Sequence, residues 1–158
     1  MAQGPKQADI ADIMRSLRRI FKAIHAYSED VLVEFGITGP QLWALRTLYT
    51  HGSISMSELS RNMYLHISTV SGVIDRLEQK GYVERKRKDS DRRVVHIGMT
   101  AAGKRLVQRA PEAAQGRLLH GLESLTPSQV RIIRSSLDRV VQLMEIEDIE
   151  ATFFFSEE

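Results

Sequence analysis

The segment from Tyr82 to Gly98 holds the densest charge in this 158-residue chain. Its cations are Arg85, Lys86, Arg87, Lys88, Arg92 and Arg93, against three acids. Because the formal net charge of the whole chain is only +2, this local block predicts a confined surface for a polyanion such as nucleic acid. A solvated run of surface charge is the alternative that charge alone leaves open.

Residue types argue against several other chemistries. With no cysteine, the chain has no disulfide, no thiolate zinc site and no thiol redox sensor. The histidines show no metal-binding spacing such as H-x-x-x-H or H-E-x-x-H. Neither a glycine-rich phosphate loop nor a G-x-S-x-G motif is present. We therefore expect no enzyme activity, no metal and no cofactor.

The basic block has the pattern of a β-hairpin. Apolar residues begin and end it, and Asp89-Ser90-Asp91 supplies turn residues in its middle. In a hairpin, the run from Arg85 to Lys88 would contact phosphates along one strand. Arg92 and Arg93 at the tip are long enough to enter a minor groove, where the negative potential is high.

An amphipathic helix is expected directly before this hairpin, over residues 68–80. Its outward side chains are small and polar at the start, followed by two charges: Ser68, Thr69, Ser71, Gly72, Asp75 and Arg76. A helix fits the major groove of DNA, and its first side chains reach base edges. Two simpler roles stay open: Ser68 as the N-cap of this helix and Asp75 as a structural charge partner.

Start signals place two more helices before it. Thr38 with Gln41, and Ser55 with Glu58, each have the spacing of a capping box. The second of these helices is short and ends near Met63. It leads through four residues into the amphipathic helix, which is the layout of a helix-turn-helix.

Longer apolar stripes flank this unit. Residues 9–35 and 126–144 repeat apolar side chains at 3-4-3-4 spacing, and a helix between them, from Thr100 to about Leu122, should kink or break at Pro111. The narrow stripes favour an intertwined homodimer, with packing inside one monomer as the alternative. We expect one domain, 1–158, that is mainly α with a small β-hairpin wing: dimerisation helices in 9–36 and 100–150, and a DNA-binding lobe in 37–99.

The stretch from Ile74 to Lys104, IDRLEQKGYVERKRKDSDRRVVHIGMTAAGK, resembles the MarR family of transcriptional regulators. The helix end DRLEQKGYVER, the D-x-R wing tip at Asp91-Arg92-Arg93 and the exit h-x-h-x-h-T-x-x-G follow one another in the family's order. This resemblance, which covers nearly the whole chain, implies a homodimeric winged helix-turn-helix repressor on a palindromic operator in double-stranded DNA. It also implies Arg93 as the minor-groove arginine, beside Arg92, with Asp75 or Asp91 orienting it through a salt bridge.

Such regulators often respond to small molecules, so we also expect an effector pocket. The candidate lining residues are aromatic or basic: His25, Tyr27, Trp43, Arg46 and Tyr49. Aromatic rings with one cation suit an aromatic carboxylate. Ordinary core packing of Trp43 and surface exposure of Arg46 form the simpler alternative.

A winged-helix adaptor that binds proteins and does not read DNA is the rival function. The cationic wing favours DNA, because an adaptor has no need of Arg92 and Arg93 behind four other cations. No apolar run spans a bilayer and no secretory signal is evident, which predicts a cytoplasmic protein without membrane contact. The cluster of Phe153, Phe154 and Phe155 near the end of the chain is expected to dock rather than to face water.

Overall fold

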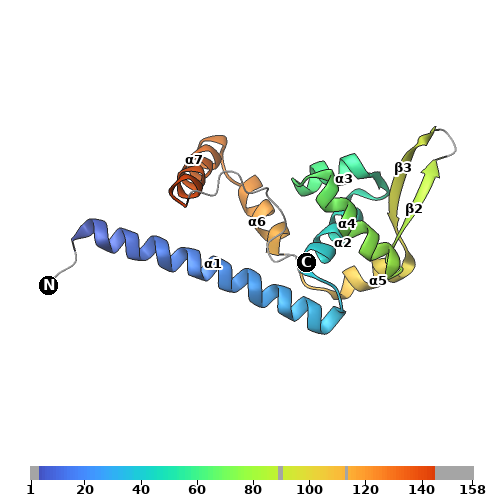
Figure 1. The fold of residues 1–158 in the computed structure, drawn as a ribbon, viewed down its shortest axis with the longest axis horizontal. Coiled ribbons are helices and arrows are strands. Elements are labelled where there is room, and N and C mark those ends of the chain that lie inside the picture. Colours follow the sequence, from blue (N-terminus) through green and yellow to red (C-terminus); the bar gives the residue numbers. More distant parts are fainter. Residues whose placement is uncertain (1–3, 89–90, 113, 145–158) are drawn as a thin grey trace.

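The computed structural model describes residues 4–88, 91–112 and 114–144. Its elements are α1 (Pro5–Phe35), α2 (Gly39–His51), β1 (Ile54–Ser55), α3 (Met56–Met63), α4 (Ile67–Gln79), β2 (Val83–Lys88), β3 (Asp91–Met99), α5 (Ala101–Arg109), α6 (Ala114–Glu123) and α7 (Pro127–Leu143). Figure 1 shows a lobe formed by α2 to α5 with the strands, from which α1 leads away as one long helix. The phenylalanine cluster of residues 153–155 lies outside the described residues.

Local capping signals set the helix starts, as predicted. The Thr38 hydroxyl accepts the Gln41 N–H at 3.4 Å, and the Gln41 side chain accepts the Thr38 N–H at 3.1 Å. Reciprocal boxes of the same kind begin α3, at Ser55, and α7, at Thr126. Each box satisfies amides that the helix itself leaves without partners.

Helix α4 begins one residue earlier than the sequence pattern predicted. Its N-cap is His66, which makes no side-chain capping bond, so the interpretation of Ser68 as the N-cap is wrong. The helix ends in a Schellman motif, with the Gly81 N–H donating to the Glu78 carbonyl and the Tyr82 N–H donating to the Leu77 carbonyl. Gly81 has a φ of 73°, the left-handed conformation that this motif requires.

The predicted hairpin is present and gains a third strand. The sheet order is β1-β3-β2, and all neighbours are antiparallel. The pairing register shifts between Arg87 and Lys88, near the tip. Figure 1 shows β2 and β3 projecting from the lobe as a wing, on the side away from α1 and α7.

The apolar core lies inside the lobe, around α2. Helix α2 packs against α1, α3, α4, α5 and β3. Fully buried side chains come from all of these elements: Val31, Leu42, Leu45, Leu48, Leu59, Met63, Val70, Ile74, Leu77, Ile97 and Val107. This core fixes the directions of α4 and of the wing.

The chain breaks its helix before Pro111, as predicted. Helix α5 ends at Arg109, and Ala110 is extended with ψ 149°, the conformation that a following proline favours. The Arg46 guanidinium of α2 collects the carbonyls left free there. It donates to the oxygens of Pro111 at 3.1 Å, Val107 at 3.4 Å and Ala110. Arg46 therefore joins the lobe to the point where the chain departs toward α6.

Helices α1 and α7 keep their apolar stripes exposed in the single chain. Among described residues, α7 has no buried side chain and α1 has only Tyr27 and Val31. The exposed apolar residues include Ile10, Ile13, Met14, Ile20, Phe21, Ile133, Leu137 and Val141. A groove of about 410 Å³ lies between the two helices.

No helix in the described ranges is long and apolar enough to cross a membrane.

Candidate nucleic-acid interface

Helix α4 presents a small, polar face to solvent. Ser68, Gly72 and Arg76 are exposed, and Thr69 and Ser71 are half-buried at the edges of that face. The opposite stripe, Val70, Val73, Ile74 and Leu77, is buried in the core. A Cβ added at Gly72 would meet no atom within 4 Å, so packing inside the chain does not require glycine there. The face is open to a partner that approaches closely.

Arg85 ties the wing to α4. Its guanidinium donates to the Asp75 carboxylate at 2.6 Å and to the Glu78 carboxylate, both on α4. The side chain is only 29% exposed, and the bond to Asp75 is the main cause of its raised pKa. We expected Arg85 to contact phosphate, either Asp75 or Asp91 to orient Arg93, and a structural charge partner as the simpler role of Asp75. The structure instead pairs Arg85 with Asp75.

Replacing Arg85 with alanine should loosen this connection. A shielded ion pair to two carboxylates stabilises by about 1 kcal/mol after solvent screening, which corresponds to a fall of roughly 3 °C in Tm. Hydrogen exchange at the β2 amides should accelerate, since the strand loses its side-chain anchor. Circular dichroism and exchange measured by mass spectrometry check the two effects.

Lys86→Ala is the matched control for Arg85→Ala. Lys86 is the next residue of β2, its side chain is 69% exposed, and it pairs with Glu84 of the same strand at 2.5 Å. Successive strand residues point to opposite faces, so Lys86 lies on the face away from α4. The control should keep the wild-type Tm. If Arg85→Ala, Lys86→Ala and wild type all had the same Tm, the ion pairs of Arg85 with Asp75 and Glu78 would not stabilise the fold.

The remaining wing residues are placed by their backbone alone. Arg87 and Lys88 end β2, and Asp91, Arg92 and Arg93 begin β3, but their side chains lie outside the described part of the structure. Residues 89 and 90, in the predicted turn, are also outside it. The minor-groove role of Arg93 and the orienting role of Asp91 therefore stay predictions.

The candidate effector residues come from α1 and α2, and the structure gives each of them its own surroundings. Tyr27 is buried and lies beneath Arg117, whose guanidinium carbon is 5.9 Å from the ring centre. Burial raises the pKa of the Tyr27 phenol to about 12, against the opposing effect of the nearby Arg46 and Arg117 charges. The Tyr27 hydroxyl has no hydrogen-bond partner among described residues. The guanidinium of Arg46 is bound to backbone carbonyls, as described above.

The other three candidates lie on the same two helices, α1 and α2. His25 is an exposed residue of α1 whose Nε2 is 3.4 Å from the Glu29 carboxylate. Trp43 packs half-buried against the core. Tyr49 is half-exposed and lines a separate cavity of about 580 Å³ with Lys86 and Lys104. Arg46 lies close enough to Tyr27 for its charge to act on the pKa of the Tyr27 phenol.

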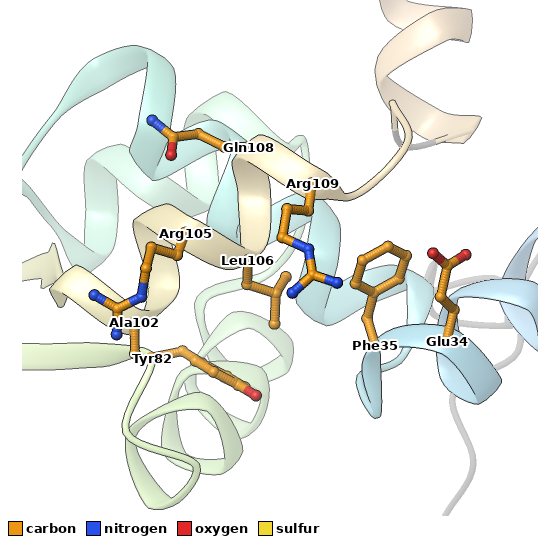
Figure 2. A pocket seen from close by; sticks show the side chains of 8 residues that line it. All are labelled: Glu34, Phe35, Tyr82, Ala102, Arg105, Leu106, Gln108 and Arg109. Carbon is orange, nitrogen blue, oxygen red and sulfur yellow. The ribbon is translucent and has the colours of Figure 1, made fainter.

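A different cavity, of about 430 Å³, lies where α1 ends against α5. Figure 2 shows Phe35 and Tyr82 on either side of Leu106, with Arg105 and Arg109 on the same helix as Leu106. Neither arginine forms an ion pair with any described residue. The cavity therefore combines an apolar floor with two arginines, and the Glu34 carboxylate also lines it. Sequence reasoning missed it because its walls come from three segments far apart in the chain.

Comparison with known proteins connects this architecture to one family. The family model "MarR family" matches residues 37–95. The HTH-type transcriptional regulator YsmB of Bacillus subtilis is 36% identical over 136 residues, covering 86% of this chain and 93% of the relative. The HTH-type transcriptional repressor MdtR of Bacillus subtilis is 36% identical over 100 residues, covering 62% of this chain and 64% of that protein.

Solved structures agree with these sequence matches. A MarR family protein from Bacillus stearothermophilus has a TM-score of 0.54 and 30% identity, covering 91% of this chain and 99% of its own. A mutant MarR from E.coli complexed with operator DNA has a TM-score of 0.57 at 22% identity, covering 84% and 96%. At 22% identity, the likeness to the E.coli protein shows that the two chains share a fold.

Proposed function

This chain belongs to the MarR family of transcriptional regulators, and from that premise we propose that it represses transcription as a homodimer bound to a palindromic operator. The observation that carries the proposal is the exposed polar face of α4 beside a wing fastened to the same helix. Arg85 joins the two elements, so they meet DNA as one rigid unit. The similarity to MdtR, which is named as a repressor, supports the direction of regulation.

In this proposal the two elements read different grooves. Helix α4 enters the major groove, where Ser68, Thr69, Ser71, Gly72 and Arg76 meet base edges and the groove wall. The wing lies along the backbone, where Lys86, Arg87 and Lys88 contact phosphates. Arg92 and Arg93 enter the adjacent minor groove, and Asp91 orients Arg93. Phosphate contacts set the affinity and its salt dependence, while base contacts set the sequence preference.

The exposed stripes of α1 and α7 support the homodimer. Two long helices with unburied apolar faces offer a surface that a second copy of the chain would cover. A two-fold dimer places its recognition helices about 34–36 Å apart, one turn of DNA. Each half of a palindrome then meets one copy of α4.

We also propose a small-molecule effector, held where the dimerisation helices meet the lobe. The cavity of Figure 2 supports this placement, because Arg105 and Arg109 suit an anionic group and Leu106 suits an apolar body. A ligand there would touch both the end of α1 and the helix that follows the wing. Its binding is expected to alter operator affinity, since it contacts elements on both sides of the junction.

Selection of bound sequences from a random pool of duplex DNA tests the proposed function. The expected result is enrichment of one palindrome whose half-sites are about one helical turn apart. Recovery of sequences with no enriched motif would contradict sequence-specific reading and favour the winged-helix adaptor. Recovery of a single unrepeated half-site would contradict the two-fold arrangement while keeping DNA binding.

A further inference from the structure

Tyr64, in the turn between α3 and α4, has a backbone conformation that tyrosine seldom adopts. Its φ is 54° and its ψ is 37°, in the left-handed region. Among described residues it is the only one other than glycine with a positive φ. In this region the Cβ crowds the following carbonyl, which makes the conformation unfavourable for any residue with a side chain except, at lower cost, asparagine or aspartate.

The turn itself requires this conformation. Tyr64 ends α3, and its N–H donates to the Arg61 carbonyl at 3.1 Å. The next residue, Leu65, donates its N–H to the Ser60 carbonyl at 3.1 Å and accepts the Ser60 hydroxyl at 2.6 Å. Leu65 then packs against the core. Glycine at position 64 would meet these demands with less strain, so the turn does not explain a tyrosine.

Packing does not explain it either. The Tyr64 residue is 72% exposed, so its ring adds little to the core. Ile67, the first residue of α4, is also 46% exposed. An aromatic and a branched apolar residue thus stand in water, three positions apart, at the end of α4 that begins the polar face. Strained backbone and exposed apolar side chains that the fold does not need are typical of a binding surface.

The position of these residues indicates which surface they would meet. When a recognition helix enters the major groove, its first turn reaches the bases and the preceding helix crosses the backbone. The turn between the two helices therefore lies at the border of the groove, against sugar and phosphate. Apolar side chains can pack on deoxyribose there, and a phenol can donate to a phosphate oxygen.

We propose that Tyr64 and Ile67 form a neutral contact with the sugar-phosphate backbone at the border of the major groove. The Tyr64 ring packs on a deoxyribose and its hydroxyl donates to a phosphate oxygen, while Ile67 covers the adjoining sugar. This inference rests on the proposed function, because it takes α4 as the helix that enters the groove. Since neither residue carries charge, their contact adds affinity without releasing counterions from the DNA.

Tyr64→Gly separates the roles of the backbone and the ring. The variant relieves the strained conformation, so its Tm should rise by about 2 °C. Its Kd for the selected operator should rise about tenfold, and the slope of log Kd against log salt should stay at the wild-type value. Fluorescence anisotropy at several salt concentrations measures both quantities. A Kd within twofold of wild type would overturn the proposal.

Two further variants keep the test decisive. Tyr64→Asn removes the ring but tolerates the left-handed conformation, so it should match the weakened binding of the glycine variant even if glycine alters the turn. Tyr64→Phe keeps the ring, and its Kd should rise about threefold if the hydroxyl bonds to phosphate. Wild-type binding by Tyr64→Asn would overturn the contact, and wild-type binding by Tyr64→Phe would overturn the phosphate bond.

Gln79→Ala is the matched control, because Gln79 is an exposed residue at the opposite end of α4. It should bind the operator as wild type does. If wild-type protein selects no DNA from the random pool, the proposed function fails and this inference fails with it. If wild type selects an operator and the Tyr64 variants bind that operator equally well, only this inference fails.

Discussion

Gly103→Ala should destabilise the lobe by about 3 kcal/mol and lower its Tm by roughly 10 °C. Gly103 lies buried in the first turn of α5, against the backbone that follows α4. A Cβ at this position would overlap the carbonyl oxygen of Tyr82 and lie 3.1 Å from its carbonyl carbon. That oxygen also accepts the Thr100 N–H at 3.1 Å, so it is held in place. Relief of the clash would require moving α5 or the base of the wing.

Gly72→Ala is the control for this stability measurement. It places the same methyl group on a helix, but in open space, where alanine is favoured over glycine by about 1 kcal/mol. Thermal and urea unfolding should therefore show opposite shifts for the two variants. If Gly103→Ala melted at the wild-type Tm, α5 could move relative to the wing without a loss of stability.

Arg93→Ala should weaken operator binding about 100-fold while the protein stays folded. Each minor-groove arginine is expected to contribute on the order of 1–2 kcal/mol, and a dimer loses two of them. The prediction depends on the D-x-R resemblance and on the place of Arg93 near the start of β3, next to the hairpin turn. Because the variant also removes a cation, the salt dependence of binding should become shallower.

Arg134→Ala removes an equal charge from a distant site and serves as the control. Arg134 is an exposed residue of α7 whose Nε is 3.9 Å from the Asp138 carboxylate. Its loss should change neither the Kd nor the Tm appreciably. Titrations of both variants against the selected operator measure the two Kd values for comparison with wild type. Wild-type affinity in Arg93→Ala would remove the wing tip from the mechanism.

The features predicted correctly from the sequence are those with local causes. The Thr38–Gln41 box, the Ser55–Glu58 box and the break at Pro111 each depend on residues a few positions apart, and all are present. The start of α4 was misplaced because its N-cap residue, His66, makes no capping bond that a pattern would reveal. Strand β1 has two residues, too few to show any alternation.

The interactions that sequence reasoning missed join distant segments. In the run from Arg85 to Lys88 every cation looks alike, and only the approach of α4 distinguishes Arg85 as an ion-pair partner. Arg46 reaches carbonyls 61 to 65 positions away, which no spacing rule predicts. The left-handed conformation of Tyr64 could not be predicted, because no sequence pattern indicates a positive φ at a tyrosine.

The exposed stripes of α1 and α7 have a consequence for how such a regulator responds to its own abundance. If their apolar faces are covered only by a second copy, then part of the stability of each chain depends on protein concentration. Below the dimer dissociation constant, the population of operator-competent dimers scales with the square of the chain concentration. A twofold fall in expression would then remove about three quarters of the active species by mass action, giving a steep threshold without any ligand.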